Sequence, residues 1–240
     1  LRRQRQMCIR DSSFFDNSAY LNPGNFSGDE ERYQQFIDNS FFQINANSSK
    51  NLIIDLRSNS GGNDFFSDYL VAYIADKPFK WHSTFRLRTS ALLKQDTKTN
   101  RDLTKPYWRS IMNNKIGRQY EFVFDEYQPV DPNKRYSGQV YVLVNRHSHS
   151  QAAVTAAQIQ DHGWGLVVGE ETGDYPTLYA SQFQYALPNT GIIVKISKGY
   201  IVRVSGSTEQ SGVIPNIAIK DHLLDKDDEI LAGLLQHIAN

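Results

Sequence analysis

The stretch VYVLVNRHSHSQAAVTAAQIQ, residues 140–160, decides the fold. Its first part, 140–144, is a short continuous apolar run, which is typical of a strand buried on both faces of a parallel sheet. Its last part, 151–160, is rich in alanine and predicts a helix that packs closely on such a sheet. A polar turn with two histidines and two serines connects them. A strand, a turn and a helix in this order predict an α/β domain.

The same order of elements occurs earlier in the chain. The run LIIDL at 52–56 predicts a second buried strand, and a turn that carries Gly61 and Gly62 follows it. A helix is expected over 64–75. Upstream, Asp29 is a suitable N-cap for a helix that ends at about residue 45. Further elements are expected as strands at 166–168, 183–186, 192–197 and 200–204 and as a helix at 228–239.

Residues 79–135 give mixed signals and hold no catalytic motif. A strand at 81–89, a polar loop at 94–105, a short helix at 107–114 and a strand at 120–127 are expected there. We interpret this region as an insertion in a core domain that covers residues 13–240. The fold class expected for the core is α/β, with a mixed sheet and flanking helices.

Composition excludes several classes of protein. The chain has 240 residues, with 26 Lys and Arg against 26 Asp and Glu, and therefore no formal net charge. A nucleic-acid or anionic-membrane partner would require a basic face, so neither is expected. No apolar run reaches the roughly 18 residues that a membrane span needs. One cysteine excludes a disulfide framework and a cysteine-based zinc site.

The first residues differ in character from the rest. The sequence LRRQRQMCIRD holds four arginines and the single cysteine, and it shows neither helix nor strand periodicity. It lacks the apolar core of a signal peptide. It is similar to a translated sequencing adaptor, so we expect residues 1–12 to be foreign to the fold and the core domain to be N-terminally incomplete. A genuine basic tail is the alternative.

The turn at 145–150 is the first candidate site. A serine there lies at the positive end of a helix dipole, beside backbone N–H groups that can stabilise an oxyanion. The alternative is that Ser148 or Ser150 only caps the helix. Gly61 and Gly62 also follow a strand, and ligands of open α/β sheets bind beyond the carboxyl ends of strands. The two turns can therefore meet at one cleft, although the glycines alone also fit a simple tight turn.

An ordered series of motifs resembles a known superfamily. The motifs are LIIDLRSNSGG, then YSGQVYVLVNRHSHSQAAVTAAQIQDHGWGLVVGEETG, then FQYALPNTG, then EQSGVIPNI. This series resembles the C-terminal-processing (tail-specific) serine peptidases. The resemblance implies a crotonase-like (Clp-peptidase-like) α/β fold. It also implies hydrolysis of polypeptides through an acyl-enzyme, without metal or other cofactor.

The resemblance also assigns roles to residues. The serine eleven positions before the aspartate of the "QDxG" element, here Asp161, is the nucleophile, which gives Ser150. The resemblance implies an oxyanion hole made by the amide of Gln151 and the amide of Gly61 or Gly62. Asp55 and Arg57 are interpreted as structural residues that fix the glycine turn.

The chain departs from the Ser–Lys branch of the superfamily. That branch has its lysine 25 residues after the serine, where this chain has Tyr175, and no lysine occurs between Lys134 and Lys195. The sequence is closer to the branch of the tricorn core protease and the retinoid-binding proteins. The tricorn-like members use a Ser–His–Glu triad whose glutamate precedes a "GVxPD" element. Glu209 precedes GVIPN here, so it is the candidate that orients a histidine base.

The base itself is not expected among residues 13–240. In the tricorn-like branch the histidine lies on an early strand, just before the region that begins here near Ser13, so this chain alone is expected to be inactive. His147 and His149 flank Ser150, but a ring one residue away rarely reaches a neighbouring hydroxyl. As an H-x-H pair they lack a third metal ligand.

Two other functions stay open at this point. The retinoid-binding branch suggests a non-catalytic module that binds a hydrophobic ligand or a peptide. A crotonase-like acyl-CoA enzyme is a weaker alternative, because the serine-bearing helix argues against it. Members of the superfamily commonly work outside the cytoplasm, so we expect a periplasmic, envelope or secreted location.

Overall fold

The computed structural model describes residues 10–15, 17–222, 224 and 226–240. The chain divides into two compact units. The first unit comprises Leu1–Trp81, Glu126–Pro176 and Gln210–Asn240, and the second comprises His82–Asp125 and Thr177–Glu209. Each unit has its own sheet and its own hydrophobic core.

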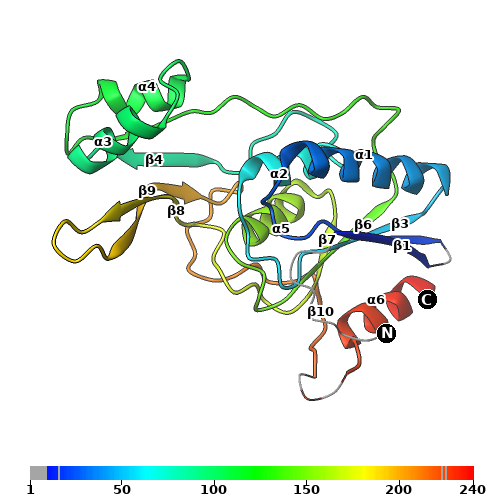
Figure 1. Ribbon diagram of the computed structural model, residues 1–240. Coiled ribbons are helices and arrows are strands. Elements are labelled where there is room, and N and C mark those ends of the chain that lie inside the picture. The colour runs from blue at the N-terminus through cyan, green and yellow to red at the C-terminus, as the bar shows by residue number, and fades with distance from the viewer. Residues whose placement is uncertain (1–9, 16, 223, 225) are drawn as a thin grey trace. The chain divides into compact units, whose positions relative to one another are not determined.

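The first unit is built on a mixed six-stranded sheet (Figure 1). Its first two strands form an antiparallel pair, and each of the other neighbouring pairs is parallel. In the order of the sheet, the strands are β1 (Asp11–Phe15), β2 (Ser18–Asn22), β3 (Asn51–Asp55), β6 (Gln139–Val144), β7 (Leu166–Gly169) and β10 (Ile217–Ala218).

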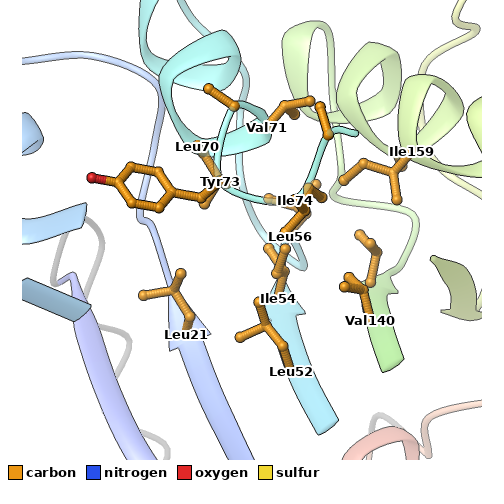
Figure 2. Packing of buried hydrophobic residues seen from close by; sticks show 14 of the residues in the cluster. Leu21, Leu52, Ile54, Leu56, Leu70, Val71, Tyr73, Ile74, Val140 and Ile159 are labelled. Carbon is orange, nitrogen blue, oxygen red and sulfur yellow. The ribbon is translucent and has the colours of Figure 1, made fainter. Parts of the chain in front are cut away.

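The two central strands of this sheet are apolar on both faces because both faces are covered. Leu52 and Ile54 of β3 belong to the core on one face, and Ile53 belongs to the core on the other. Figure 2 shows the first of these cores, in which Leu52 and Ile54 of β3 belong to the same cluster as Val71 and Ile159. Helices α1 (Glu30–Ala46), α2 (Asp64–Val71) and α5 (Gln151–His162) cover this face, and α6 (Glu229–Ala239) covers the opposite face.

The predicted helices and buried strands of the first unit are present. Asp29 is the N-cap of α1, and its side chain accepts a hydrogen bond from the Arg32 N–H. One face of α1 is buried and carries Tyr33, Ile37, Phe41 and Ile44, with the spacing of an amphipathic helix. Helix α2 ends at Val71, earlier than expected, and a buried turn continues the chain to Ala75.

Strands β1 and β2 were not predicted from local patterns of residues. Asp11 and Ser12 of β1 pair with Asn22 and Leu21 of β2, so the predicted boundary at residue 12 falls inside a strand. Arg10 donates a hydrogen bond to the Ser27 carbonyl and its guanidinium lies 4.9 Å from the centre of the Tyr33 ring. Residues 1–9 of the segment expected to be foreign lie outside the described residues.

The second unit holds a four-stranded antiparallel sheet in the order β5-β4-β9-β8. It extends beyond the predicted insertion at 79–135 because β4 pairs with β9, which comes from residues far along the chain. The expected loop at 94–105 is partly helix α3, which begins after the capping residue Ser90. The elements are β4 (Thr84–Arg88), α3 (Ala91–Asn100), α4 (Pro106–Asn113), β5 (Gln119–Glu121), β8 (Leu178–Ala186) and β9 (Ile193–Val202).

Within the described ranges, none of the helices is both long and apolar enough to cross a membrane.

Candidate active site

Ser150 lies at the N-cap of α5 in a strained backbone conformation. Its φ is 48° and its ψ is −121°, values that a residue with a Cβ rarely adopts. Such a conformation costs on the order of 1–3 kcal/mol and is found mostly at functional sites. The Ser150 side chain makes no capping hydrogen bond, and no bond of its hydroxyl is found among the described residues. The interpretation of Ser150 as a simple helix cap is therefore wrong.

Ser148 has the opposite environment. It is fully buried, and its hydroxyl donates a hydrogen bond to the Leu56 carbonyl at 2.9 Å and accepts one from the Asn145 N–H at 3.0 Å. These bonds connect the end of β3 to the end of β6. Ser148 is therefore a structural residue, and it does not cap α5 either.

The diglycine turn contacts the Ser150 turn directly. A Cβ atom added to Gly61 would lie 2.7 Å from the Ser150 Cβ and 2.7 Å from the Gln151 nitrogen. A Cβ added to Gly62 would lie 1.9 Å from the Phe26 carbonyl oxygen. Both glycines also have positive φ, 87° and 143°. The structure therefore brings together the two turns that the sequence places at the ends of different strands.

The backbone amides at this junction fall into two groups. The Gly61 N–H donates to Asn59 Oδ1 at 2.8 Å, and the Ser150 N–H donates to Asp174 Oδ2 at 2.6 Å. No hydrogen bond from the Gly62 or Gln151 N–H is found among the described residues. Of the two glycine amides that the resemblance leaves open, Gly62 is the one available to a ligand.

The two turns are also fastened to each other. The Asn59 carbonyl accepts a hydrogen bond from the His149 N–H at 2.9 Å. The Gln151 side chain is buried and donates through Nε2 to Ser67 Oγ on α2 at 2.9 Å. The start of α5 is thus held against the start of α2, with both free amides at the junction.

Asp174 is a site residue that the sequence analysis missed. Besides accepting the Ser150 N–H, it has Oδ1 at 3.6 Å from Nδ1 of His149, whose side chain is half exposed. The only sequence signal for Asp174 was its place directly before Tyr175, which occupies the lysine position of the Ser–Lys branch. Tyr175 itself is exposed.

The histidines do not form a metal site in the part of the chain that the structure describes. No group of three or more His, Cys, Asp or Glu side chains is placed there to hold a metal ion. The rings of His147 and His149 are 6.5 Å apart between centroids, and His147 is exposed.

Asp55 and Arg57, which precede the diglycine turn in the chain, are structural residues. Arg57 pairs with Asp55 and with Asp228, and the Tyr20 hydroxyl also donates to Asp55. Burial opposes the charge of Arg57, but the two carboxylates outweigh it and raise the pKa of Arg57 above its usual value. The pair fixes the chain between β3 and the glycines.

Helix α2 carries two carboxyl groups just after the diglycine turn. Asp68 is buried, and its Oδ1 has no hydrogen-bond partner in the described part of the chain. Burial, and then the charge of Asp64, raise the pKa of Asp68 well above its ordinary value. Burial also raises the pKa of Asp64.

Glu209, the candidate orienting residue, belongs to the second unit. It is exposed, and its backbone N–H donates to Ser207 Oγ at 3.3 Å. Its role toward a histidine stays a prediction.

Comparisons with known proteins identify a relative by sequence. A tail-specific protease from Haemophilus influenzae is 32% identical over 128 aligned residues, which cover 46% of this chain and 18% of that protein. This chain therefore aligns with less than a fifth of that curated relative.

Solved structures share the fold. The crystal structure of mature CPAF has a TM-score of 0.68 at 20% identity, covering 92% of this chain and 50% of the other. A putative peptidase from Parabacteroides merdae has a TM-score of 0.63 at 20% identity, covering 96% and 64%. The photosystem II D1 C-terminal processing protease has a TM-score of 0.56 at 19% identity, covering 93% and 47%. The expected crotonase-like, Clp-protease-like fold is confirmed.

The model of peptidase family S41 matches residues 17–219, which include both turns of the site. The chain belongs to peptidase family S41.

Proposed function

We propose that this chain is the core of a serine endopeptidase that hydrolyses polypeptides through an acyl-enzyme on Ser150. One observation carries the proposal: an unpartnered, strained serine lies against a glycine turn, with two free backbone amides at the junction. Strained nucleophiles and preorganised amides are recurring features of acyl-transfer sites.

In the first step, Ser150 Oγ attacks the carbonyl carbon of the substrate peptide bond and gives its proton to a general base. The carbonyl oxygen becomes an oxyanion, which accepts hydrogen bonds from the N–H groups of Gln151 and Gly62. Removing one such donor typically costs about 2.7–4 kcal/mol in the transition state. The C–N bond then breaks, and the leaving amine takes the proton from the base. Water hydrolyses the acyl-enzyme and restores the serine.

The base is proposed to be a histidine from outside residues 13–240, oriented by Glu209 as the resemblance implies. No metal or other cofactor is required by this mechanism. The substrate is proposed to be a polypeptide, met outside the cytoplasm in the periplasm, the envelope or the medium. Two similar proteins, a tail-specific protease and the photosystem II D1 C-terminal processing protease, support this class of substrate.

A fluorophosphonate probe tests the proposal, because it bonds covalently to an activated serine. The full-length protein should be labelled at Ser150, as mass spectrometry of the tryptic peptide would show. Ser150→Ala should abolish labelling, whereas Ser148→Ala should leave the label at residue 150. Labelling that persists in Ser150→Ala would remove this residue from the mechanism.

A non-catalytic module that binds a peptide or a hydrophobic ligand is the second candidate. Tyr175, which occupies the position of the lysine in the Ser–Lys branch, favours it. This alternative predicts peptide binding by the full-length protein with no labelling and no cleavage.

A further inference from the structure

The backbone at Ser150 is held in place from two sides. Its carbonyl accepts the Val154 N–H at 3.1 Å, which is the ordinary first bond of the helix. Its N–H donates to Asp174 Oδ2 at 2.6 Å. Only the second bond comes from outside the helix. It therefore restrains the residue at the point where φ is unfavourable.

Asp174 is itself fixed by its own neighbours. Thr172 Oγ1 donates to the Asp174 carbonyl at 2.9 Å and accepts the Val213 N–H at 2.8 Å. The next residue, Gly173, donates its N–H to the Ser148 carbonyl at 3.1 Å. The segment 172–174 is thus hydrogen-bonded to the serine turn, residues 145–150, through the Gly173 N–H and the Asp174 side chain.

Close packing shows how tightly this segment follows the turn. A Cβ atom added to Gly173 would lie 2.3 Å from the Arg146 carbonyl oxygen and 2.5 Å from Cε1 of His149. A side chain at position 173 would therefore push Asp174 away from the Ser150 amide.

The negative charge of Asp174 and its ability to accept a hydrogen bond have different effects on the site. A carboxylate is favourable at the N-terminus of α5, where the helix dipole is positive. The same charge would oppose an oxyanion that forms at the neighbouring Gln151 amide. The useful property of this side chain is therefore its hydrogen-bond acceptor, which an asparagine oxygen can supply.

We infer that Asp174 is a positioning residue, which holds the Ser150 backbone so that the hydroxyl faces the substrate and the Gln151 amide stays free. This inference rests on the proposed function of Ser150. Asp174 is not among the site residues predicted from the sequence, which are the nucleophile, the oxyanion-hole residues and the orienting glutamate.

The test compares Asp174→Ala with Asp174→Asn in the full-length protein. The measured quantity is the rate constant of fluorophosphonate labelling, corrected for the folded fraction. We expect Asp174→Ala to lower it at least tenfold. Asp174→Asn should be labelled at least threefold faster than Asp174→Ala, because the side-chain oxygen of asparagine still accepts a hydrogen bond from the Ser150 N–H.

Glu170→Ala is the matched control, since Glu170 pairs with Arg146 on the same turn and has no described contact with Ser150. Its rate should stay within twofold of the unmodified protein.

A second measurement does not depend on activity. Hydrogen exchange of the Ser150 amide, resolved by NMR, should accelerate at least tenfold in Asp174→Ala and less in Asp174→Asn. If exchange stays at the control rate in Asp174→Ala, the inference is overturned. It is also overturned if Asp174→Ala labels as fast as the control, or if the asparagine variant is no faster than the alanine variant. If the unmodified protein takes no label, the proposed function fails, and exchange alone then decides whether Asp174 holds this amide.

Discussion

The two turns that meet at the site obtain unusual backbone conformations in different ways. In the diglycine turn, Gly61 and Gly62 adopt positive φ without a steric cost, and their missing Cβ atoms leave room for Phe26 and for the serine turn. In the serine turn (residues 145–150), Ser150 adopts positive φ despite its Cβ, and one hydrogen bond from outside the helix, to Asp174 Oδ2, restrains its N–H. Composition shapes the first turn, whereas tertiary contacts shape the second.

This difference determines how each turn should respond to mutation. The diglycine turn should fail when atoms are added, because there is no space for them. The serine turn should fail when hydrogen-bonding groups are removed. Gly62→Ala and Ser148→Ala test this contrast.

The largest effect is expected from Gly62→Ala. The new Cβ would meet the Phe26 carbonyl oxygen at 1.9 Å, so the turn must shift and carry the Gly62 amide with it. Loss of one oxyanion donor lowers the rate about 10²–10³-fold, and fluorophosphonate labelling kinetics would measure this loss.

Gly163→Ala is the control for that substitution. Gly163 ends α5 with a φ of 72°, but a Cβ there would meet no heavy atom within 4 Å. It should cost about 1 kcal/mol of stability, as expected of a side chain forced into positive φ, and leave the labelling rate of the folded protein within twofold. Equal labelling by both alanine variants would show that close packing at Gly62 is not what shapes the site.

A smaller effect is expected from Ser148→Ala, and it should be on stability. The substitution removes the bonds to the Leu56 carbonyl and from the Asn145 N–H inside the protein. The Leu56 carbonyl keeps its hydrogen bond from the Asn59 N–H, but the part-buried Asn145 N–H loses the acceptor described for it. Leaving one such group without a partner costs roughly 1–3 kcal/mol, which urea denaturation would measure. Ser150→Ala makes the matching comparison, because its hydroxyl has no described partner and its loss should change the unfolding free energy little. Similar costs for both would contradict the assignment of Ser148 as the structural serine.

The contrast between the turns also explains what the sequence could predict. Apolar runs identified β3, β6 and β7, because a strand buried on both faces must be apolar throughout. The diglycine turn was visible because glycine is the residue that such a turn requires. By spacing alone Ser148 and Ser150 were equally good helix caps. Only the tertiary structure separates them, by burying the first beside Leu56 and leaving the second without a partner.

Other features could not be predicted from local pattern. Strand β2 reads SAYLN, which is too short and too polar to stand out, and it is a strand because β3 pairs with it. Likewise, the second unit joins 82–125 to 177–209 through the pairing of β4 with β9, which no local signal encodes. Asp174 contacts Ser150 across 24 positions of sequence, so its role became visible only with coordinates.

The smallest effect is expected on the pH dependence of stability, and it concerns Asp68, one of the two carboxyl groups on α2. Asp174 beside the serine turn is hydrogen-bonded, whereas Asp68 on α2 is buried with one oxygen unpartnered. Because burial raises the pKa of Asp68, the folded state binds more protons than the unfolded state between the ordinary pKa and the raised one. The contribution of Asp68 to stability should therefore fall as pH rises through this window.

Asp68→Asn removes the titration and should flatten this part of the profile. Below about pH 4 the two proteins should be similarly stable, because the protonated carboxyl and the amide are both neutral. Toward pH 7 the asparagine variant should become the more stable, because its amide stays neutral whereas the buried Asp68 carboxyl must ionise. Urea denaturation at pH 4, 5.5 and 7 measures the difference, with exposed Asp131→Asn as the control. A constant difference across this range would contradict a raised pKa for Asp68.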